Sequence, residues 1–528
     1  MLLVLGCGSG ASAQEQFLTL AIELMQPLTA GDKSLNWDEL NAFYLNGRTE
    51  PVWLGEQGPN LRAELLRERL RQADAEGLVA LHYPVAHIDR LWSSPRQEER
   101  LQLELTLSSA FFDYTRDVRD GRLEPQQVAP LWLIEKVPVD AVSMLRLALL
   151  EEDFSAALDG LAPIHPGYRR LRDALARYRA IQAQHGEWPQ LPPGPTLRPG
   201  EMEPRVVVLR ERLMLEGDHM LPQGVNSSHY DQPLEYAVRR FQVRHGLEAD
   251  GLVGEETLAA LNVTLAERIE QIVLAMERWR WLPQYLGRRH ILVNIPAFEL
   301  IAYEEGEAQL SMPVIVGTTE RPTPVIRGML HTVVFNPDWT VPRTIALQDV
   351  IPRQRRNPDY MPSQGIRVYA DWQGEWELDP QEVDWGSVNK NHFPYMLRQA
   401  PGPLNALGKV KFLFYNGHDV YLHDTPHQGL FARYSRAYSS GCIRLEEPLQ
   451  LVNFVLAEEG EGRWDERAVR KIIDSGKTHG VALTGRIPVY LLYFTAWVAE
   501  DGAVHFRPDI YGEDALVRPC MPFEEQNP

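Results

Sequence analysis

The sequence predicts an α+β protein of several domains: a helical N-terminal scaffold, a three-helix module, and a β-rich, sandwich-like domain with an inserted lid-like segment. The chain has 528 residues, more than one hydrophobic core usually serves. Apolar residues recur at helical spacing in the first third, and short strand-like runs rich in β-branched residues follow residue 290. A stretch dense in Pro and Gly, residues 188–200, marks a boundary between these parts.

The helical scaffold and the Pro-rich linker that ends it are expected over residues 14–200. Residues 99–118 and 140–150 carry apolar side chains at the spacing of one helix face. The linker cannot form a regular element, because proline has no backbone N–H to donate and fixes its own φ.

Residues 201–264 are expected to form the small module. Three short helices are predicted at 205–215, 232–245 and 255–261, with an Asp250-Gly251 turn before the last. Their apolar positions would meet in one small core, made of Leu209, Leu213, Leu234, Val238 and Phe241.

The β-rich domain is expected over residues 286–460, after a helix at 266–281. Short strands are predicted at 291–295, 300–303, 312–316, 332–335, 410–415 and 420–422. Residues 343–400 differ in being polar, rich in proline and marked by three tryptophans, so they are interpreted as an inserted capping segment. Beyond a helix at 448–457, residues 461–528 are expected to be a C-terminal extension containing a helix at 464–475 and strands near 489–499 and 504–506.

Charge and composition exclude several classes of protein. Acidic residues outnumber basic ones, 72 against 53, which disfavours a nucleic-acid partner because such proteins gather Lys and Arg on one face. No apolar run reaches the roughly 20 residues of a membrane span, so no integral membrane segment is expected in the mature chain. Soft ligands are too few and scattered for a metal site, and no cofactor is expected.

The first 13 residues are interpreted as the remnant of a secretory signal. An apolar start and the small residues of Ala11-Ser12-Ala13 resemble its end, although the usual basic start is missing. A frayed terminus is the alternative. Val4-Leu5-Gly6-Cys7 loosely resembles a lipoprotein cleavage box, and lipid anchoring is the less favoured possibility.

Cys442 is the candidate nucleophile and His423 its base. A thiol becomes strongly nucleophilic when a base or a positive field favours the thiolate. His423 follows the strand predicted at 420–422, and the loop between the two residues is long enough to fold back. The spacing of these residues leaves one non-catalytic alternative open, a disulfide between Cys442 and Cys520.

Residues around the pair have candidate supporting roles. The amides of Gly441 and Cys442 would face a developing oxyanion, and glycine permits the backbone conformation that this requires. Arg444 would hold a substrate carboxylate or, alternatively, cap a nearby helix. Asp424 is set aside as a third triad member, because strand neighbours point to opposite faces, and a backbone carbonyl is expected to orient His423 instead. His418 and His427 are expected to be solvated bystanders.

Two sequence motifs resemble the signature of L,D-transpeptidases, in particular the large multi-domain murein type. They are Tyr421-Leu422-His423-Asp424-Thr425-Pro426 and Ser439-Ser440-Gly441-Cys442-Ile443-Arg444. Other blocks agree with that subgroup: Asn336-Pro337-Asp338-Trp339, Arg398-Gln399-Ala400-Pro401-Gly402, Lys411-Phe412 and Tyr493-Phe494-Thr495-Ala496. Many members carry His where this chain has Ser440, so the base role rests on His423 alone. Tyr421 and Ser440 join Gly441 and Arg444 as candidate oxyanion or substrate-binding residues.

The module also carries a family pattern. Ala237-Val238-Arg239-Arg240-Phe241-Gln242, His245-Gly246-Leu247, Asp250-Gly251 and Thr257-Leu258-Ala259-Ala260-Leu261-Asn262 resemble a peptidoglycan-binding module. A generic three-helix spacer is the alternative.

The resemblance implies a periplasmic enzyme that acts on peptidoglycan tetrapeptide stems as acyl donor and acceptor. The Cys442 thiolate would attack the third stem residue, expel terminal D-alanine and pass the acyl group to an amine of a neighbouring stem. Carbapenems, which mimic the acyl donor in this family, would acylate Cys442. L,D-carboxypeptidase activity or D-amino-acid exchange through the same thioester remains an alternative, as does a non-catalytic wall-binding scaffold.

Overall fold

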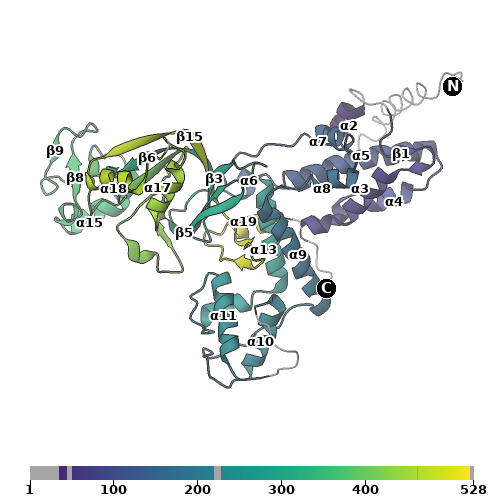
Figure 1. Cartoon of the computed structure of the whole chain (residues 1–528), viewed down its shortest axis with the longest axis horizontal. Helices are drawn as coiled ribbons and strands as arrows, with labels where there is room; N and C mark the ends of the chain where they lie inside the picture. Colours follow the sequence, from purple (N-terminus) through teal and green to yellow (C-terminus); the bar gives the residue numbers. More distant parts are fainter. Residues whose placement is uncertain (1–34, 45–49, 219–226, 461, 522, 524–528) are drawn as a thin grey trace.

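The computed structural model describes residues 35–44, 50–218, 227–460, 462–521 and 523. The predicted signal remnant, residues 1–13, and Cys7 lie outside these residues. Figure 1 shows three bodies around a central pair of helices: the N-terminal helices, the small module, and the β-domain with its insertion at the far end. The α+β multidomain class predicted from the sequence is confirmed.

The N-terminal helices pack around the long helix α5 (Gln97–Arg119), which is buried on most sides. Its neighbours are α2 (Trp37–Tyr44), α3 (Leu61–Arg71), α4 (Val85–Leu91) and α7 (Ala141–Ala148). α8 (Phe154–Asp159) packs against α3 and α7, and the short strands β1 (Leu54–Gly55) and β2 (Gly58–Pro59) pair with each other. The turn α6 (Pro125–Val128) follows α5 and packs against the core of the large sheet. Glu104 lies inside this core and accepts hydrogen bonds from the Tyr44 hydroxyl (2.8 Å) and the Trp53 amide (3.0 Å). The helical region therefore has a hydrophobic core of its own.

Two helices join the scaffold to the β-domain. α9 (Pro166–His185) packs against α13 (Leu265–Arg280), and both contribute to the same core as the large sheet. α13 begins with a capping box, in which Thr264 and Glu267 exchange hydrogen bonds. Trp132, from the helical region, also pairs with Val325 beside the sheet. The expected domain limit at residue 200 thus falls between α9 and α13, although both helices belong to one hydrophobic core.

The small module has the three predicted helices, α10 (Arg205–Glu216), α11 (Gln232–Arg244) and α12 (Glu255–Leu261). Asp231 caps α11 by accepting a hydrogen bond from the Leu234 amide (3.1 Å). All five apolar residues expected in its core are buried together: Leu209, Leu213, Leu234, Val238 and Phe241.

The β-domain is one nine-stranded sheet in the order β13-β5-β14-β12-β11-β6-β15-β3-β4, and β4 also pairs with β5, which closes the sheet on itself. The strands are β3 (Arg289–Asn294), β4 (Glu299–Glu304), β5 (Glu307–Gly317), β6 (Ile326–Phe335), β11 (Val410–Tyr415), β12 (Leu422–His423), β13 (Ala437–Ser439), β14 (Ile443–Leu445) and β15 (His479–Leu492). Helices α17 (Pro448–Leu456) and α18 (Glu466–Asp474) follow β14 and pack against this core.

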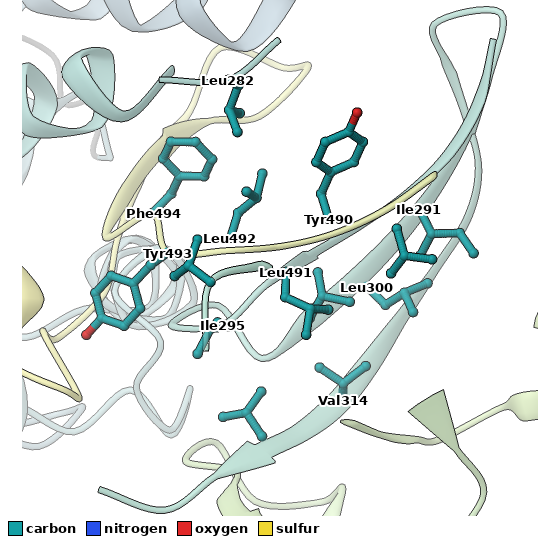
Figure 2. Close-up of a cluster of buried hydrophobic side chains, with 14 of the residues drawn as sticks. Leu282, Ile291, Ile295, Leu300, Val314, Tyr490, Leu491, Leu492, Tyr493 and Phe494 are labelled. Atoms are coloured by element: carbon teal, nitrogen blue, oxygen red, sulfur yellow. The ribbon is translucent and has the colours of Figure 1, made fainter. Parts of the chain in front are cut away.

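The sheet extends beyond the expected limit at residue 460. β15 lies in the segment interpreted as a C-terminal extension, yet it pairs with both β3 and β6 inside the sheet. Figure 2 shows its last residues and the two that follow among buried side chains of other strands, including Ile291, Leu300 and Val314. An apolar run signals a buried strand but says nothing about which partners it joins, and so the sequence placed this strand outside the domain.

The insertion forms a subdomain. β6 and β11 pair with each other, and the chain between them leaves the sheet to build a second one in the order β7-β10-β8-β9. Its elements are β7 (Trp339–Thr340), α14 (Arg343–Ile345), α15 (Ile351–Arg356), α16 (Tyr360–Ser363), β8 (Ile366–Tyr369), β9 (Glu377–Leu378) and β10 (Met396–Gln399). Trp385 and Phe393 belong to its separate core.

The last elements, β16 (Ala496–Val498), β17 (Val504–Phe506) and α19 (Glu513–Val517), lie beside α9 and α13. Among the described residues, no helix is both long and apolar enough to cross a membrane.

Candidate functional site

The candidate residues converge on one face of three neighbouring strands. β12 and β14 run parallel, with Leu422 opposite Ile443 and His423 opposite Arg444. The Ile443 amide donates to the Tyr421 carbonyl (3.1 Å), which places Cys442 beside Tyr421. Because side chains alternate along a strand, Tyr421, His423, Cys442 and Arg444 share one face. His423 and Cys442 are therefore diagonal neighbours, a relation that separates residues by about 7–8 Å and remains within reach of long side chains.

His423 has the burial and hydrogen bonding of a neutral base. Its side chain is 5% exposed, and Nδ1 lies 2.5 Å from the backbone carbonyl of Asp424. A carbonyl can only accept, so Nδ1 carries the proton and Nε2 keeps its lone pair. Burial, with a smaller contribution from the charge of Arg444, lowers the pKa of His423 to about 3. The imidazole is thus uncharged at neutral pH and free to accept a proton.

The Asp424 carboxylate faces away from the imidazole. It accepts hydrogen bonds from the Lys409 amide (2.7 Å) and the Thr425 amide (2.7 Å). This is the arrangement expected from strand alternation: the carbonyl of Asp424 orients His423, and its side chain closes a turn. His418 and His427 are exposed, in keeping with the bystander interpretation.

The thiol of Cys442 lies in a desolvated and positively charged setting. Burial raises the pKa of Cys442, and the backbone and hydroxyl of Tyr421 and the charges of Lys411 and Arg444 oppose that rise. Sγ is 3.8 Å from the carbonyl of Asp419. Asp419 has a positive φ of 54°, which is uncommon for a residue with a side chain, and it sits in the turn that leads into Tyr421.

Lys411 is a residue of this face to which the sequence assigned no role. It lies opposite His423 in the antiparallel pairing of β11 and β12, and its Nζ is 3.9 Å from the centre of the Tyr421 ring. Burial lowers the pKa of Lys411, while the nearby thiol opposes that shift. The sequence block Lys411-Phe412 agrees with the family pattern and so pointed to this residue. Only the pairing register of the strands shows that the Lys411 side chain lies on the face of the thiol.

The turn before Cys442 is held by hydrogen bonds. Gly441 has a φ of 111°, which explains the glycine, and Thr323 Oγ1 donates to its carbonyl (2.9 Å). The Gly441 amide donates to Ser439 Oγ (3.1 Å), whereas the Cys442 amide makes no hydrogen bond with any described residue. Of the two expected oxyanion donors, Cys442 N–H is the one that is available in this conformation.

The remaining candidates differ in how close they lie to the thiol. Arg444 is half-buried, and its guanidinium forms no ion pair or hydrogen bond within the described residues, so nothing there supports the helix-capping alternative. Tyr421 touches both the thiol and Trp339, at the base of the insertion, whose indole lowers the pKa of the Tyr421 hydroxyl against the larger effect of burial. Ser440 is exposed, and its substrate-binding role stays a prediction.

The structure does not have the disulfide that was the alternative for Cys442 and Cys520. Both Cys442 and Cys520 are free thiols. Within the residues that the structure describes, no group of three or more His, Cys, Asp or Glu side chains could hold a metal ion. The arrangement brings together a thiol, a neutral imidazole and two cations, a combination suited to acyl transfer through a thioester.

Three family models match the chain. Residues 288–478 match an L,D-transpeptidase catalytic domain, residues 203–261 match a domain described as "Putative peptidoglycan binding domain", and residues 38–175 match a scaffold domain.

One curated relative, from Haemophilus influenzae and named "Putative L,D-transpeptidase", is 39% identical over 248 residues. That match spans 47% of this chain and about half, 49%, of the relative. Two crystal structures of L,D-transpeptidases are also matched, from Xylanimonas cellulosilytica (16% identity, 57% of this chain and 100% of that one, TM-score 0.18) and Stackebrandtia nassauensis (12% identity, 58% and 96%, TM-score 0.22). Scores this low carry no argument about function.

Proposed function

Because this chain belongs to the L,D-transpeptidase family, we propose that it cross-links peptidoglycan stem peptides through an acyl-enzyme on Cys442. The observation that carries the proposal is the shared strand face: a half-buried thiol lies diagonal to a neutral imidazole whose Nε2 is free to accept a proton. The third stem residue of a tetrapeptide, usually meso-diaminopimelate in this family, is the proposed acyl donor.

In the first step, His423 Nε2 takes the proton of Cys442, and the sulfur attacks the carbonyl carbon of the third stem residue. The C–N bond to terminal D-alanine then breaks, and the leaving amine receives the proton from His423. A thioester and free D-alanine result. In the second step an acceptor amine attacks the thioester, gives its proton to His423 and leaves as a new amide, and the thiol takes back its proton.

The cations of the strand face are suited to the charges that develop. The sulfur becomes negative before attack, and Lys411 and Arg444 favour that charge over the neutral thiol. The tetrahedral intermediate carries an oxyanion, for which the Cys442 amide is the proposed donor. A neutral His423 carries no positive charge that could stabilise the thiolate before the proton moves. Lys411 and Arg444 supply that positive charge instead.

The three-helix module is proposed to hold the enzyme on the cell wall, outside the cytoplasm. Binding to an insoluble polymer raises the local concentration of stems without changing the chemistry. The periplasmic location proposed here follows from that substrate.

The direct test is to incubate the purified chain with a disaccharide-tetrapeptide and to separate the products by mass spectrometry. Release of D-alanine with a cross-linked dimer is expected; a tripeptide monomer alone would point to L,D-carboxypeptidase activity. Cys442→Ala should abolish both products, and Cys520→Ala, which removes the exposed second thiol, should keep them. Absence of D-alanine release from the unmodified chain would refute acyl transfer and favour the non-catalytic scaffold.

A further inference from the structure

A cavity of about 440 Å³ lies over the outer face of β3 and β4, away from the candidate active site. His290, Leu292 and Asn294 of β3 line it, whereas Ile291 and Val293, which alternate with them, point into the hydrophobic core. The start of α9, the end of α13 and the chain around β16 form the other walls. At least two strands separate β3 and β4 from β12, which bears His423. The size is within the range of about 300–1,000 Å³ typical of small-ligand pockets.

His165, which precedes α9, places an unpaired acceptor in this cavity. Its side chain is 6% exposed, and Nε2 lies 3.0 Å from the Pro283 carbonyl. A carbonyl only accepts, so the proton is on Nε2 and Nδ1 keeps a lone pair. Nδ1 has no hydrogen-bond partner among the described residues, and it is not one of the atoms that the fold encloses completely. Burial lowers the pKa of His165 to about 4, so the ring is neutral at pH 7.

His290 places a second unpaired acceptor in the same cavity. Its side chain is 9% exposed and stacks on the Tyr303 ring, with 5.0 Å between ring centres. Nδ1 lies 2.9 Å from the Gly287 carbonyl, which assigns the proton to Nδ1 and leaves the lone pair on Nε2. Within the described part of the chain Nε2 has no partner, and it too is not completely enclosed. Burial lowers the pKa of His290, which keeps this ring neutral as well.

Asn294 supplies an unpaired donor. It is 8% exposed, and its Oδ1 accepts a hydrogen bond from the Phe494 amide (3.0 Å), which fixes the orientation of the side-chain amide. Nδ2 makes no hydrogen bond with any residue that the structure describes, and it is not shut off from the cavity. His290 and Asn294 are four residues apart on β3, a separation of roughly 13 Å at about 3.3 Å per residue.

The charged side chains of the cavity do not favour a charged ligand. They are exposed or half-buried and carry both signs: Arg170, Arg288, Glu299, Glu305 and Glu500. The buried polar groups beneath them are neutral, and an anion offers no donor for the two imidazole lone pairs. Among the described residues, the two histidines belong to no group of side chains that could hold a metal ion. The cavity therefore fits an uncharged organic ligand.

The unpaired atoms define what that ligand must carry. Two acceptors and one donor call for a ligand with at least two donors and one acceptor, because buried groups left unpaired are costly. A hydroxyl group both donates and accepts, so a set of neighbouring hydroxyls satisfies all three atoms. A Tyr or Trp side chain or one peptide bond of a protein partner brings a single donor. The requirement is thus met by a polyhydroxylated molecule rather than by a peptide side chain.

We propose that this cavity binds a short chain of neutral sugar units. Hydroxyl groups would donate to His165 Nδ1 and His290 Nε2 and accept from Asn294 Nδ2, while apolar wall residues pack against the C–H groups of the sugar rings. More than one ring is needed, because a single sugar does not span from His290 to Asn294. A glycan strand of the cell wall is the source that rests on the proposed function; any other neutral oligosaccharide has the same chemistry.

The test titrates the full chain with two sugars in a calorimeter. Chitotetraose is a chain of N-acetylglucosamine without stem peptides, and maltotetraose has hydroxyl groups but no acetyl groups. Leu292→Trp fills the floor of the cavity between His290 and Asn294 and should weaken sugar binding at least tenfold. Leu147→Trp, at an exposed leucine of α7 outside the cavity, is the matched control and should bind like the unmodified chain.

A second pair of variants isolates one hydrogen bond. His290→Phe keeps a ring on Tyr303 and removes the acceptor, so a loss of affinity of roughly 2- to 13-fold is expected. His331→Phe is the matched control, because His331 also stacks on a tyrosine, Tyr415, in the same sheet but does not line the cavity. It should leave the affinity unchanged.

The two sugars identify the source of the ligand. Binding of chitotetraose alone assigns the site to N-acetylated glycan, and binding of both sugars assigns it to neutral oligosaccharides in general. The proposal is overturned if neither sugar binds the unmodified chain, or if the two variants of either pair bind equally while their melting temperatures show that they are folded. Neither sugar carries a stem peptide, so D-alanine release from a disaccharide-tetrapeptide tests the proposed function independently of these results.

Discussion

Removing the charge of Lys411 should raise the pKa of the Cys442 thiol. The lysine lies opposite His423 on β11, on the face that carries the thiol, and its charge favours thiolate over thiol. Lys411→Met keeps an unbranched chain of similar length over the Tyr421 ring and removes only the ammonium group. The midpoint of thiolate formation should therefore move to higher pH.

The size of the shift follows from the sheet geometry. β12 lies between β11, which carries Lys411, and β14, which follows Cys442, but Lys411 Nζ reaches to 3.9 Å from the centre of the Tyr421 ring, and Tyr421 lies beside Cys442. The ammonium group and the sulfur are therefore on the order of 7 Å apart, where two unit charges at an effective dielectric constant of about 20 interact by roughly 2.4 kcal/mol. The ammonium group is partly exposed, so screening reduces this by about half. At about 1.4 kcal/mol per pKa unit, the expected rise is roughly one unit.

The rate of alkylation by iodoacetamide against pH measures this midpoint, because the thiolate is the reacting species. The background should be Cys520→Ala, which leaves Cys442 as the only thiol in the described part of the chain. Lys471→Met, an exposed lysine on α18, is the matched control and should leave the midpoint in place. If the pH midpoint of thiolate formation is unchanged or lower in Lys411→Met, the assignment of Lys411 as the counter-charge of Cys442 is refuted.

The same charge acts on His423 in the same direction. A nearby cation disfavours imidazolium, so its removal should raise the pKa of His423 from about 3 as well. Both limbs of the pH profile of kcat/KM are then expected to move to higher pH together. Movement of the two limbs in opposite directions would mean that Lys411 acts by positioning rather than by charge.

Three further outcomes are expected. A carbapenem should add its mass to the chain and to Cys520→Ala but not to Cys442→Ala; an adduct in the last would place the nucleophile elsewhere. Gly441→Ala should cost about 1–3 kcal/mol of strain because φ is 111°, and should lower turnover and melting temperature together; an unchanged melting temperature would argue against strain. Burial raises the pKa of Glu104 from 4.5 to about 7, so between these pH values the folded state binds a proton that the unfolded state has lost. The free energy of unfolding should therefore fall as pH rises from about 4.5 to 7. Urea titrations measure this trend, and Glu104→Gln should flatten it.

The sequence predicted individual helices and strands better than it predicted which distant segments pack or pair with one another. The three helices of the module and their five core residues needed only helical periodicity and turn residues, and the structure has them. β15 was assigned to an extension because its apolar run carries no information about its partners. Trp132 and α9 were assigned to the scaffold for the same reason, although both contribute to the core of the sheet.

The candidate site shows the same division. Strand alternation correctly turned the Asp424 carboxylate away from His423 and left its carbonyl to orient the ring, because that relation lies within one strand. Lys411 was missed because its relation to the thiol depends on the pairing of three strands. The sequence could not show that the Gly441 amide already donates a hydrogen bond, because its acceptor, Ser439 Oγ, is brought into position by the conformation of the turn.

The parallel register of β12 and β14 has a chemical consequence. It places Cys442 beside Tyr421 and puts Arg444, not the thiol, opposite His423. His423 is thus separated from Cys442 by one diagonal step and faces a cation on each neighbouring strand, Arg444 on β14 and Lys411 on β11. Burial, together with the two cations, lowers the pKa of His423 and keeps it neutral, while the same cations favour the thiolate of Cys442. In the proposed mechanism, one charge pattern therefore prepares both the acceptor of the proton and the sulfur that releases it. A register shifted by one residue would abolish this arrangement by sending Cys442 to the opposite face.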